Sequence, residues 1–304
     1  MLHLLSVFAP ILLIFVGMVP LLFLGLWGDI KKKKRKGENA ATQDLLRSPG
    51  YSLRERIGEL NDELMYYMMW MVMLPVLAYA TVVSRAYWAG SGLIAFEAVL
   101  VTFSAIAGMV VLGRRLSRIM EDLQRKRLGM EGELATGEEL NLLMLEGCRV
   151  FHDIQTANGN IDHIVVAPGG VFSINTKSWW KPKEGPDRAK VRVDFGDGTL
   201  RFADGRVKDI PYPQLNAEAR WLATQLTGAV GKPVSVKPVL ALTGSFLEGK
   251  TRSPELDVIN PKNCRGFFLE RPVVLTQEDI GQIVYQLEQR ARDIPLSFKE
   301  PRRW

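Results

Sequence analysis

The first 28 residues contain no Asp, Glu, Lys or Arg, and this uncharged stretch constrains the fold more than any other feature of the chain. At 1.5 Å per residue, a helix over residues 4–27 spans the roughly 30 Å hydrocarbon core of a bilayer. A secretory signal peptide is the alternative, but no Lys or Arg precedes the apolar run, the run is too long, and no small-residue cleavage site follows. Residues 1–29 are therefore predicted to form a transmembrane helix.

Two further apolar stretches follow, at residues 64–84 and 92–112. The first contains Pro75, which a membrane helix tolerates better than a soluble helix does. The second carries one acid, Glu97. An acid inside a membrane is a candidate functional residue, but this one lies within two turns of the predicted helix start and can reach the lipid headgroups. Residues 64–113 are predicted to form a hairpin of two transmembrane helices.

The positions of Lys and Arg predict the orientation of these helices. Segment 30–63 holds nine of them, including the run Lys31–Lys36, whereas the link between the second and third stretches holds only Arg85. The N-terminus is therefore expected outside, with 30–63 as a basic cytoplasmic loop and the C-terminal domain in the cytoplasm. The lysine run could also contact nucleic acid, but beside a membrane helix it more often contacts anionic lipid headgroups.

Residues 114–304 carry 29 of the 39 Lys and Arg and 25 of the 33 Asp and Glu. Their number suffices for a sizeable core, and their slight basic excess permits contact with DNA, RNA or anionic lipid without requiring it. The two cysteines, Cys148 and Cys264, exclude a disulfide framework and show no metal-ligand spacing. This cysteine usage suits the reducing cytoplasm.

Hydrophobic periodicity predicts an α/β domain over residues 131–304. A helical linker (114–130) continues the third membrane helix into a helix over 131–146. The period then changes to two, with turns at Asn158-Gly159 and Pro168-Gly169-Gly170, which predicts a meander of three strands. The strands are expected at 149–154, 161–167 and 171–177. Later elements are expected as strands 191–195, 200–202 and 234–242 and helices 214–227 and 277–293, the last with a capping box from Thr276.

Four residues of this region form the candidate catalytic set: Glu133, Asp162, Asn175 and Lys177. Asn175 and Lys177 are two apart on one strand and so share a face, and Asp162 lies beside them if the flanking strands pair. Hard oxygen ligands (Glu133, Asp162 and Asn175) with a nearby lysine suit phosphodiester hydrolysis assisted by Mg²⁺ or Mn²⁺. On spacing alone, a surface Asp and a solvated Lys remain the alternative.

Three ordered motifs resemble the nuclease-related domain (NERD) family, which is assigned to the PD-(D/E)XK restriction-endonuclease-like superfamily. The motifs are Gly132-Glu133, Asn160-Ile161-Asp162-His163 and Gly170-Val171-Phe172-Ser173-Ile174-Asn175-Thr176-Lys177, and the similarity covers roughly residues 129–243. The resemblance implies a restriction-endonuclease-like mixed sheet flanked by helices, here preceded by three transmembrane helices. It also implies a metal-dependent nuclease of DNA or RNA, which the predicted topology would place at the cytoplasmic membrane face.

One position departs from the family pattern. The superfamily motif is Glu-x-Lys, whereas this chain has Asn175-Thr176-Lys177. A unit charge lost beside a divalent ion is worth several kcal/mol at an effective dielectric of about 20, so another acid such as Glu138 or Glu139 would have to compensate. Without one, the domain is a catalytically degenerate module that binds nucleic acid or protein at the membrane. A structural or sensing membrane protein is the third reading.

Aromatic and basic residues follow Lys177 directly, and they can stack bases and contact phosphates. Trp179, Lys181, Lys183 and the later Gln214 are the candidate nucleic-acid contacts; a membrane-surface contact or a plain loop is the alternative. His163 is expected on the strand face opposite Asp162, as a packing or hydrogen-bonding residue.

Overall fold

The computed structural model describes residues 44–88, 94–157, 159–181, 184, 187 and 189–294. They divide into two compact units, one formed by residues 59–123 and the other by residues 44–58 together with 124–294. The predicted first membrane helix (1–29) and the run Lys31–Lys36 lie outside the described residues.

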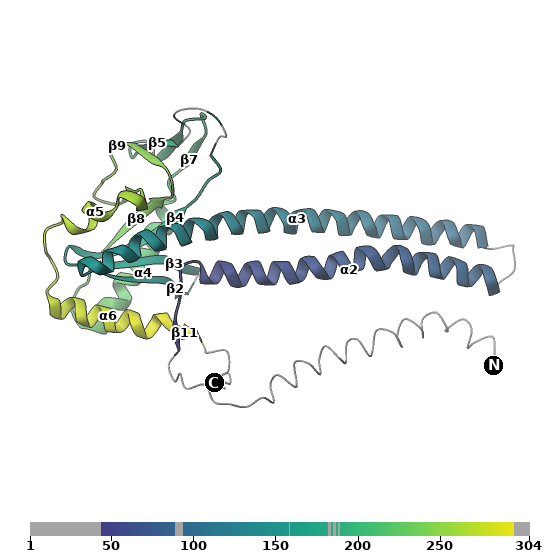
Figure 1. The fold of residues 1–304 in the computed structure, drawn as a ribbon, viewed down its shortest axis with the longest axis horizontal. Helices are drawn as coiled ribbons and strands as arrows, with labels where there is room; N and C mark the ends of the chain where they lie inside the picture. Colours follow the sequence, from purple (N-terminus) through teal and green to yellow (C-terminus); the bar gives the residue numbers. More distant parts are fainter. Residues whose placement is uncertain are drawn as a thin grey trace. The chain divides into compact units, whose positions relative to one another are not determined.

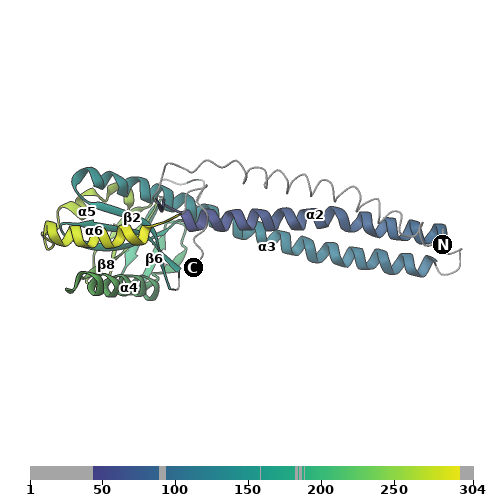
Figure 2. The ribbon, with the colours of Figure 1, turned by 90° about the horizontal axis from the view of Figure 1, so that it is seen from below.

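The first unit consists of parts of two long helices, α2 (Tyr51–Trp88) and α3 (Ile94–Leu142), which lie side by side within it (Figures 1 and 2). The helices approach closely at Gly108, where a Cβ would lie 2.8 Å from a methyl carbon of Leu74. Glu97 is not isolated, because Arg85 donates to its carboxylate at 3.1 Å. The single acid of the third apolar stretch therefore pairs with the single cation of the preceding link.

These two helices are long and apolar enough to cross a membrane, by length and composition. Almost none of their apolar stretches is buried inside the protein, and Met65, Tyr79, Phe96 and Phe103 are all exposed. The continuity of the third stretch with the linker is as predicted. The start of α2 differs from the prediction. The helix begins at Tyr51 instead of Leu64, because Leu53, Ile57 and Leu60 already follow helical spacing in the expected loop.

A five-stranded mixed sheet forms the centre of the second unit. Its strand order is β10 (Asp257–Ile259), β8 (Val236–Leu242), β4 (Gly170–Lys177), β3 (Gly159–Ala167) and β2 (Arg149–Thr156). The predicted meander is confirmed: β2 pairs with β3 and β3 with β4, both antiparallel, while β4 pairs with β8 in parallel. This mixed sheet is consistent with the restriction-endonuclease-like fold.

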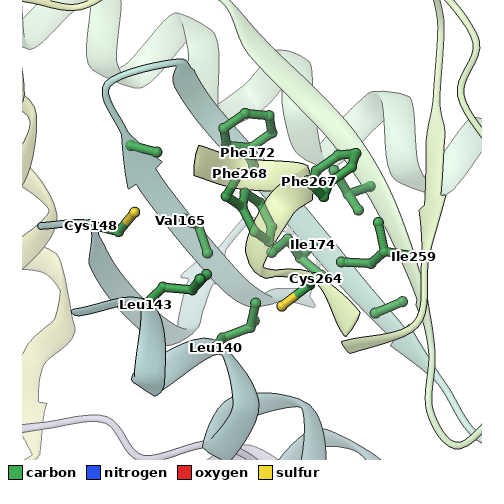
Figure 3. Close-up of a cluster of buried hydrophobic side chains, with 13 residues drawn as sticks. Leu140, Leu143, Cys148, Val165, Phe172, Ile174, Ile259, Cys264, Phe267 and Phe268 are labelled. Atoms are coloured by element: carbon green, nitrogen blue, oxygen red, sulfur yellow. The ribbon is translucent and has the colours of Figure 1, made fainter. Parts of the chain in front are cut away.

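Helices cover both faces of this sheet. Helices α4 (Tyr212–Val230) and α6 (Gln277–Ala291) pack on one face through a cluster that includes Ile164, Leu222 and Ile283. On the other face, Leu140 and Leu143 join Phe172 and the residues of α5 (Arg265–Leu269), as Figure 3 shows. Leu143 belongs to the short 3₁₀ helix η1 (Leu143–Glu146), in which the predicted helix over 131–146 ends. The expected capping box of α6, between Thr276 and Asp279, is confirmed.

A second sheet combines predicted and unpredicted strands. Its order is β7 (Val207–Asp209), β6 (Thr199–Phe202), β5 (Lys190–Asp194) and β9 (Phe246–Gly249). The antiparallel pair of β5 and β6 matches the strands expected at 191–195 and 200–202. The outer strands β7 and β9 were not predicted.

Five further elements were not predicted, and two of them are the strand β10 and the helix α5. A 3₁₀ helix η2 (Pro261–Asn263) precedes α5. A two-stranded ribbon joins β1 (Leu45–Leu46) to β11 (Arg292–Ile294). Because of this ribbon, residues 44–58 belong to the same compact unit as the α/β domain, which is larger than the predicted 131–304.

Candidate active site

A cavity of ≈ 800 Å³ opens beside the ends of β3 and β4. Acidic, basic, aromatic and amide side chains line it. The acids are Glu133, Asp162 and Glu218; the bases are Arg125, Lys177, Arg206 and Lys208; the aromatics are Trp179, Trp180 and Trp221; the amides are Asn160, Asn175 and Gln214. The four residues of the predicted catalytic set thus meet in one cavity.

Asp162 lies on β3 beside the end of β4. The antiparallel register that pairs His163 with Ile174 brings it there, and its Oδ2 accepts the backbone N–H of Thr176 at 2.7 Å. Burial raises the pKa of this carboxyl to about 7, against the Thr176 hydrogen bond, which lowers it. The charge of Glu218 raises the pKa of Asp162 further.

Glu133 reaches the cavity from α3. The preceding residue must be small, because a Cβ at Gly132 would overlap the hydroxyl of Ser178 just past β4. Burial raises the pKa of Glu133 to about 9, and the nearby charge of Asp162 adds to the effect. The carboxyl also accepts a backbone hydrogen bond from Gly50, a partner that the sequence did not suggest.

Asn175 carries no charge, but a carboxylate lies next to it. Its Nδ2 donates to Glu218 of α4 at 3.3 and 3.5 Å, and Gln214 Nε2 donates to the same carboxylate at 2.8 Å. Glu218 was missed in the sequence, although it is one helical turn from Gln214 and so on the same face. Glu138 and Glu139, the acids expected to compensate for Asn175, do not line the cavity. Glu139 lies near Cys264, which belongs to the hydrophobic cluster on the other face of the sheet.

The oxygen atoms of the cavity suit a hard divalent cation. Glu133 Oε2 and Asn175 Oδ1 are buried without a hydrogen-bond partner. Such buried oxygens lower the stability of the folded state unless a hydrogen-bond donor or a cation binds them. Among the residues that the structure describes, no three His, Cys, Asp or Glu side chains gather into a ready-made metal site. Mg²⁺ needs no such cage, since it keeps several waters and uses one or two carboxylates plus substrate phosphate.

The rim of the cavity is basic and aromatic. Trp179 packs against Phe202 at 4.9 Å between ring centroids and lies under the ammonium group of Lys208, which is 4.4 Å from the ring centre. Trp180 is 66% exposed, so its face is available. Lys181 lines a smaller neighbouring cavity instead. Lys183 lies outside the described residues.

His163 is fully buried on the opposite strand face, as expected. Its Nδ1 lies 2.9 Å from His152 Nδ1, and His152 Nε2 lies 2.9 Å from Asn141 Oδ1. Burial lowers the pKa of His152 to about 4 and lowers that of His163 well below its usual value. Both imidazoles are therefore neutral at pH 7 and do not line the cavity.

The geometry agrees with a comparison against known families: residues 128–243 match the family model of the nuclease-related domain. This match supports the resemblance seen in residues 129–243, and it covers α3 from Leu128, the β2–β4 meander, α4 and β8. No curated protein and no solved structure matches the chain. A nuclease-related function is thus indicated for this segment at the level of the family.

Proposed function

We propose that the chain is a membrane-anchored nuclease that hydrolyses phosphodiester bonds of DNA or RNA with the aid of Mg²⁺ or Mn²⁺. One observation carries the proposal: the partnerless buried oxygens of Glu133 and Asn175 line the same cavity as Asp162 and Lys177. Oxygen ligands with a lysine beside them suit metal-assisted phosphodiester hydrolysis.

Each residue has a role in this proposal. Asp162, Glu133 and Asn175 would hold the cation through oxygen atoms, and the Thr176 N–H donates to the Asp162 carboxylate and so orients it. A divalent cation held there would supply Lewis-acid activation of the attacking water. Lys177 offsets charge on the scissile phosphate. In the reaction, the water gives up a proton as its oxygen bonds to phosphorus, the P–O bond to the leaving oxygen breaks, and the leaving oxygen takes up a proton.

A cleavage assay on the full chain in detergent tests the proposal. Plasmid, single-stranded DNA and RNA are incubated with Mg²⁺, Mn²⁺ or EDTA. We expect metal-dependent cleavage by the wild type and about a hundredfold loss or more in Asp162→Asn and Lys177→Met. Asp209→Asn, on the exposed strand β7, serves as the matched control. Cleavage that survives EDTA, or that both variants retain, would contradict the proposal.

A second candidate, a module that binds nucleic acid or a protein without cutting, is favoured by Asn175, because the amide supplies no charge to a cation. The same assay separates the two. Binding of labelled oligonucleotide by the wild type, with no cleavage under any metal condition, would select the binding module.

We also propose that α2 and α3 are membrane-spanning and that the α/β domain faces the cytoplasm. The exposed apolar side chains of both helices support the membrane span. The basic segment 30–63 supports the orientation. Native Cys148 and Cys264 are buried, so a membrane-impermeant maleimide has little background. We expect labelling from outside intact cells in Tyr87→Cys and none in Lys208→Cys; the reverse pattern would invert the topology.

A further inference from the structure

Glu218 is held at the cavity by two amide side chains. Asn175 Nδ2 donates to it from β4 at 3.3 Å, and Gln214 Nε2 donates from the preceding turn of α4 at 2.8 Å. An amide that donates through its nitrogen leaves its oxygen free, and Asn175 Oδ1 has no other partner. The side-chain nitrogen of Asn175 therefore binds the Glu218 carboxylate, while its side-chain oxygen has no partner.

Glu218 belongs to the same electrostatic cluster as Asp162. The half-buried Glu218 carboxyl has a raised pKa because of burial, and its charge in turn raises the pKa of Asp162. Both carboxyls line the same cavity, and two like charges in one cavity are costly unless a cation offsets them or one of them is protonated. The cavity thus has the number of carboxylates that the Glu-x-Lys motif would give, but one of them comes from a helix instead of the strand.

We infer that Glu218 supplies the negative charge that Asn175 lacks, and that this charge strengthens the binding of a divalent cation in the cavity. Asn175 and Gln214 are its positioning residues. This inference rests on the proposed function, since it names a further residue of the same site. It replaces the idea that Glu138 or Glu139 compensates, because neither lines the cavity.

The test measures the binding of Mn²⁺ to the full chain in detergent. Titration calorimetry gives the dissociation constant, and the electron paramagnetic resonance signal of free Mn²⁺ gives an independent value of it. Glu218→Gln keeps the size and the hydrogen-bonding capacity but removes the charge, so we expect its dissociation constant to rise about tenfold or more. The matched control is Glu278→Gln. Glu278 also accepts from a glutamine four residues away, Gln282, but on α6 and away from the cavity.

A charge relocation makes the test specific. In Asn175→Glu/Glu218→Gln the carboxylate returns to the strand, and we expect Mn²⁺ affinity to recover to within about threefold of the wild type. Asn175→Glu alone places a second carboxylate against Glu218, so without metal its thermal midpoint should fall, and its affinity should rise little. The double variant also covers the case in which Glu218→Gln fails to fold.

Two outcomes would overturn the inference while the proposed function stands. One is wild-type affinity in Glu218→Gln beside a large loss in Asp162→Asn. The other is a large gain of affinity in Asn175→Glu alone, which would show that the position lacked a carboxylate. A wild type that binds no Mn²⁺ and cleaves nothing would instead overturn the proposed function, and the inference with it.

Discussion

Ser52 donates both its backbone N–H and its hydroxyl to one oxygen of Asp153, at 2.8 and 2.7 Å. Asp153 is fully buried on β2 and has a positive φ of 52°. The guanidinium of Arg47 reaches the same oxygen at 3.1 Å, and Asn160 donates to the other at 2.6 Å. The first turn of α2 is thereby fastened to the central sheet, next to Gly50, whose backbone contacts Glu133.

Replacement of Asp153 should loosen this attachment. Removing one partner of a buried ion pair leaves unsatisfied donors, so we expect Asp153→Ala to lower the unfolding free energy by about 3 kcal/mol or more. Asp293→Asn is the control, because Asp293 binds the same arginine at an exposed position and exposed pairs contribute little. Thermal unfolding checks both, and equal midpoints in the two variants would contradict the role given to Asp153.

The close approach of α3 to the end of β4 depends on Gly132. An added Cβ would overlap the Ser178 hydroxyl, so we expect Gly132→Ala to displace Glu133, to destabilise the unit by about 1–3 kcal/mol and to weaken Mn²⁺ binding. Gly228→Ala in α4 is the control, because a Cβ added there would meet nothing within 4 Å. Mn²⁺ titration and thermal unfolding provide the readout; an unperturbed Gly132→Ala would refute the steric argument.

The raised pKa values predict how stability depends on pH. Unfolded carboxyls lose their protons near pH 4, whereas folded Asp162 and Glu133 keep theirs to about 7 and about 9. Between these limits the folded state binds more protons, so the metal-free protein should lose stability as pH rises from about 4 to about 9. Thermal midpoints at pH 5, 7 and 9 test this, and Glu133→Gln should flatten the upper part of the slope.

Mn²⁺ should reverse this trend, because the cation competes with protons for the same oxygens. Its stabilisation should grow with pH, and calorimetry in buffers of different ionisation enthalpy should show proton release on binding. If the thermal midpoints of the wild type and of Glu133→Gln depended on pH in the same way, Glu133 would not be a buried carboxyl with a raised pKa.

The basic and aromatic rim should bind single strands. We expect Trp180→Ala to weaken binding of a labelled oligonucleotide by about 1–3 kcal/mol at every salt concentration. Lys208→Gln should instead reduce the dependence of log K on log salt by about 0.7. Anisotropy in EDTA, which prevents cleavage, measures both. Lys262→Gln, at an exposed position away from the cavity, should bind the oligonucleotide as the wild type does. If it also weakened the binding, the binding would be non-specific.

The sequence predicted what depends on local pattern. The β2–β4 meander follows from period-two hydrophobicity between glycine-containing turns. This pairing alone was enough to bring Asp162 next to Asn175 and Lys177, and the single missing charge of the motif was visible in the sequence as well.

What was missed depends on long-range packing. Glu218 reaches the cavity only because α4 packs against β4, and no spacing in the sequence encodes that contact. The attachment of residues 44–58 rests on contacts such as Ser52 to Asp153, across about a hundred residues of chain. The outer strands of the second sheet, β7 and β9, have 3 and 4 residues and are too short for a clear alternation.

Cleavage of the protein backbone by bound iron tests most directly where the cation lies. Fe²⁺ replaces Mg²⁺ in the full chain, and ascorbate with peroxide then generates hydroxyl radicals that cut the chain near the metal. We expect cuts close to Glu133, Asp162, Asn175 and Glu218, suppressed by excess Mg²⁺ and absent in Asp162→Asn. Cuts at other positions, or the same cuts in Asp162→Asn, would contradict it.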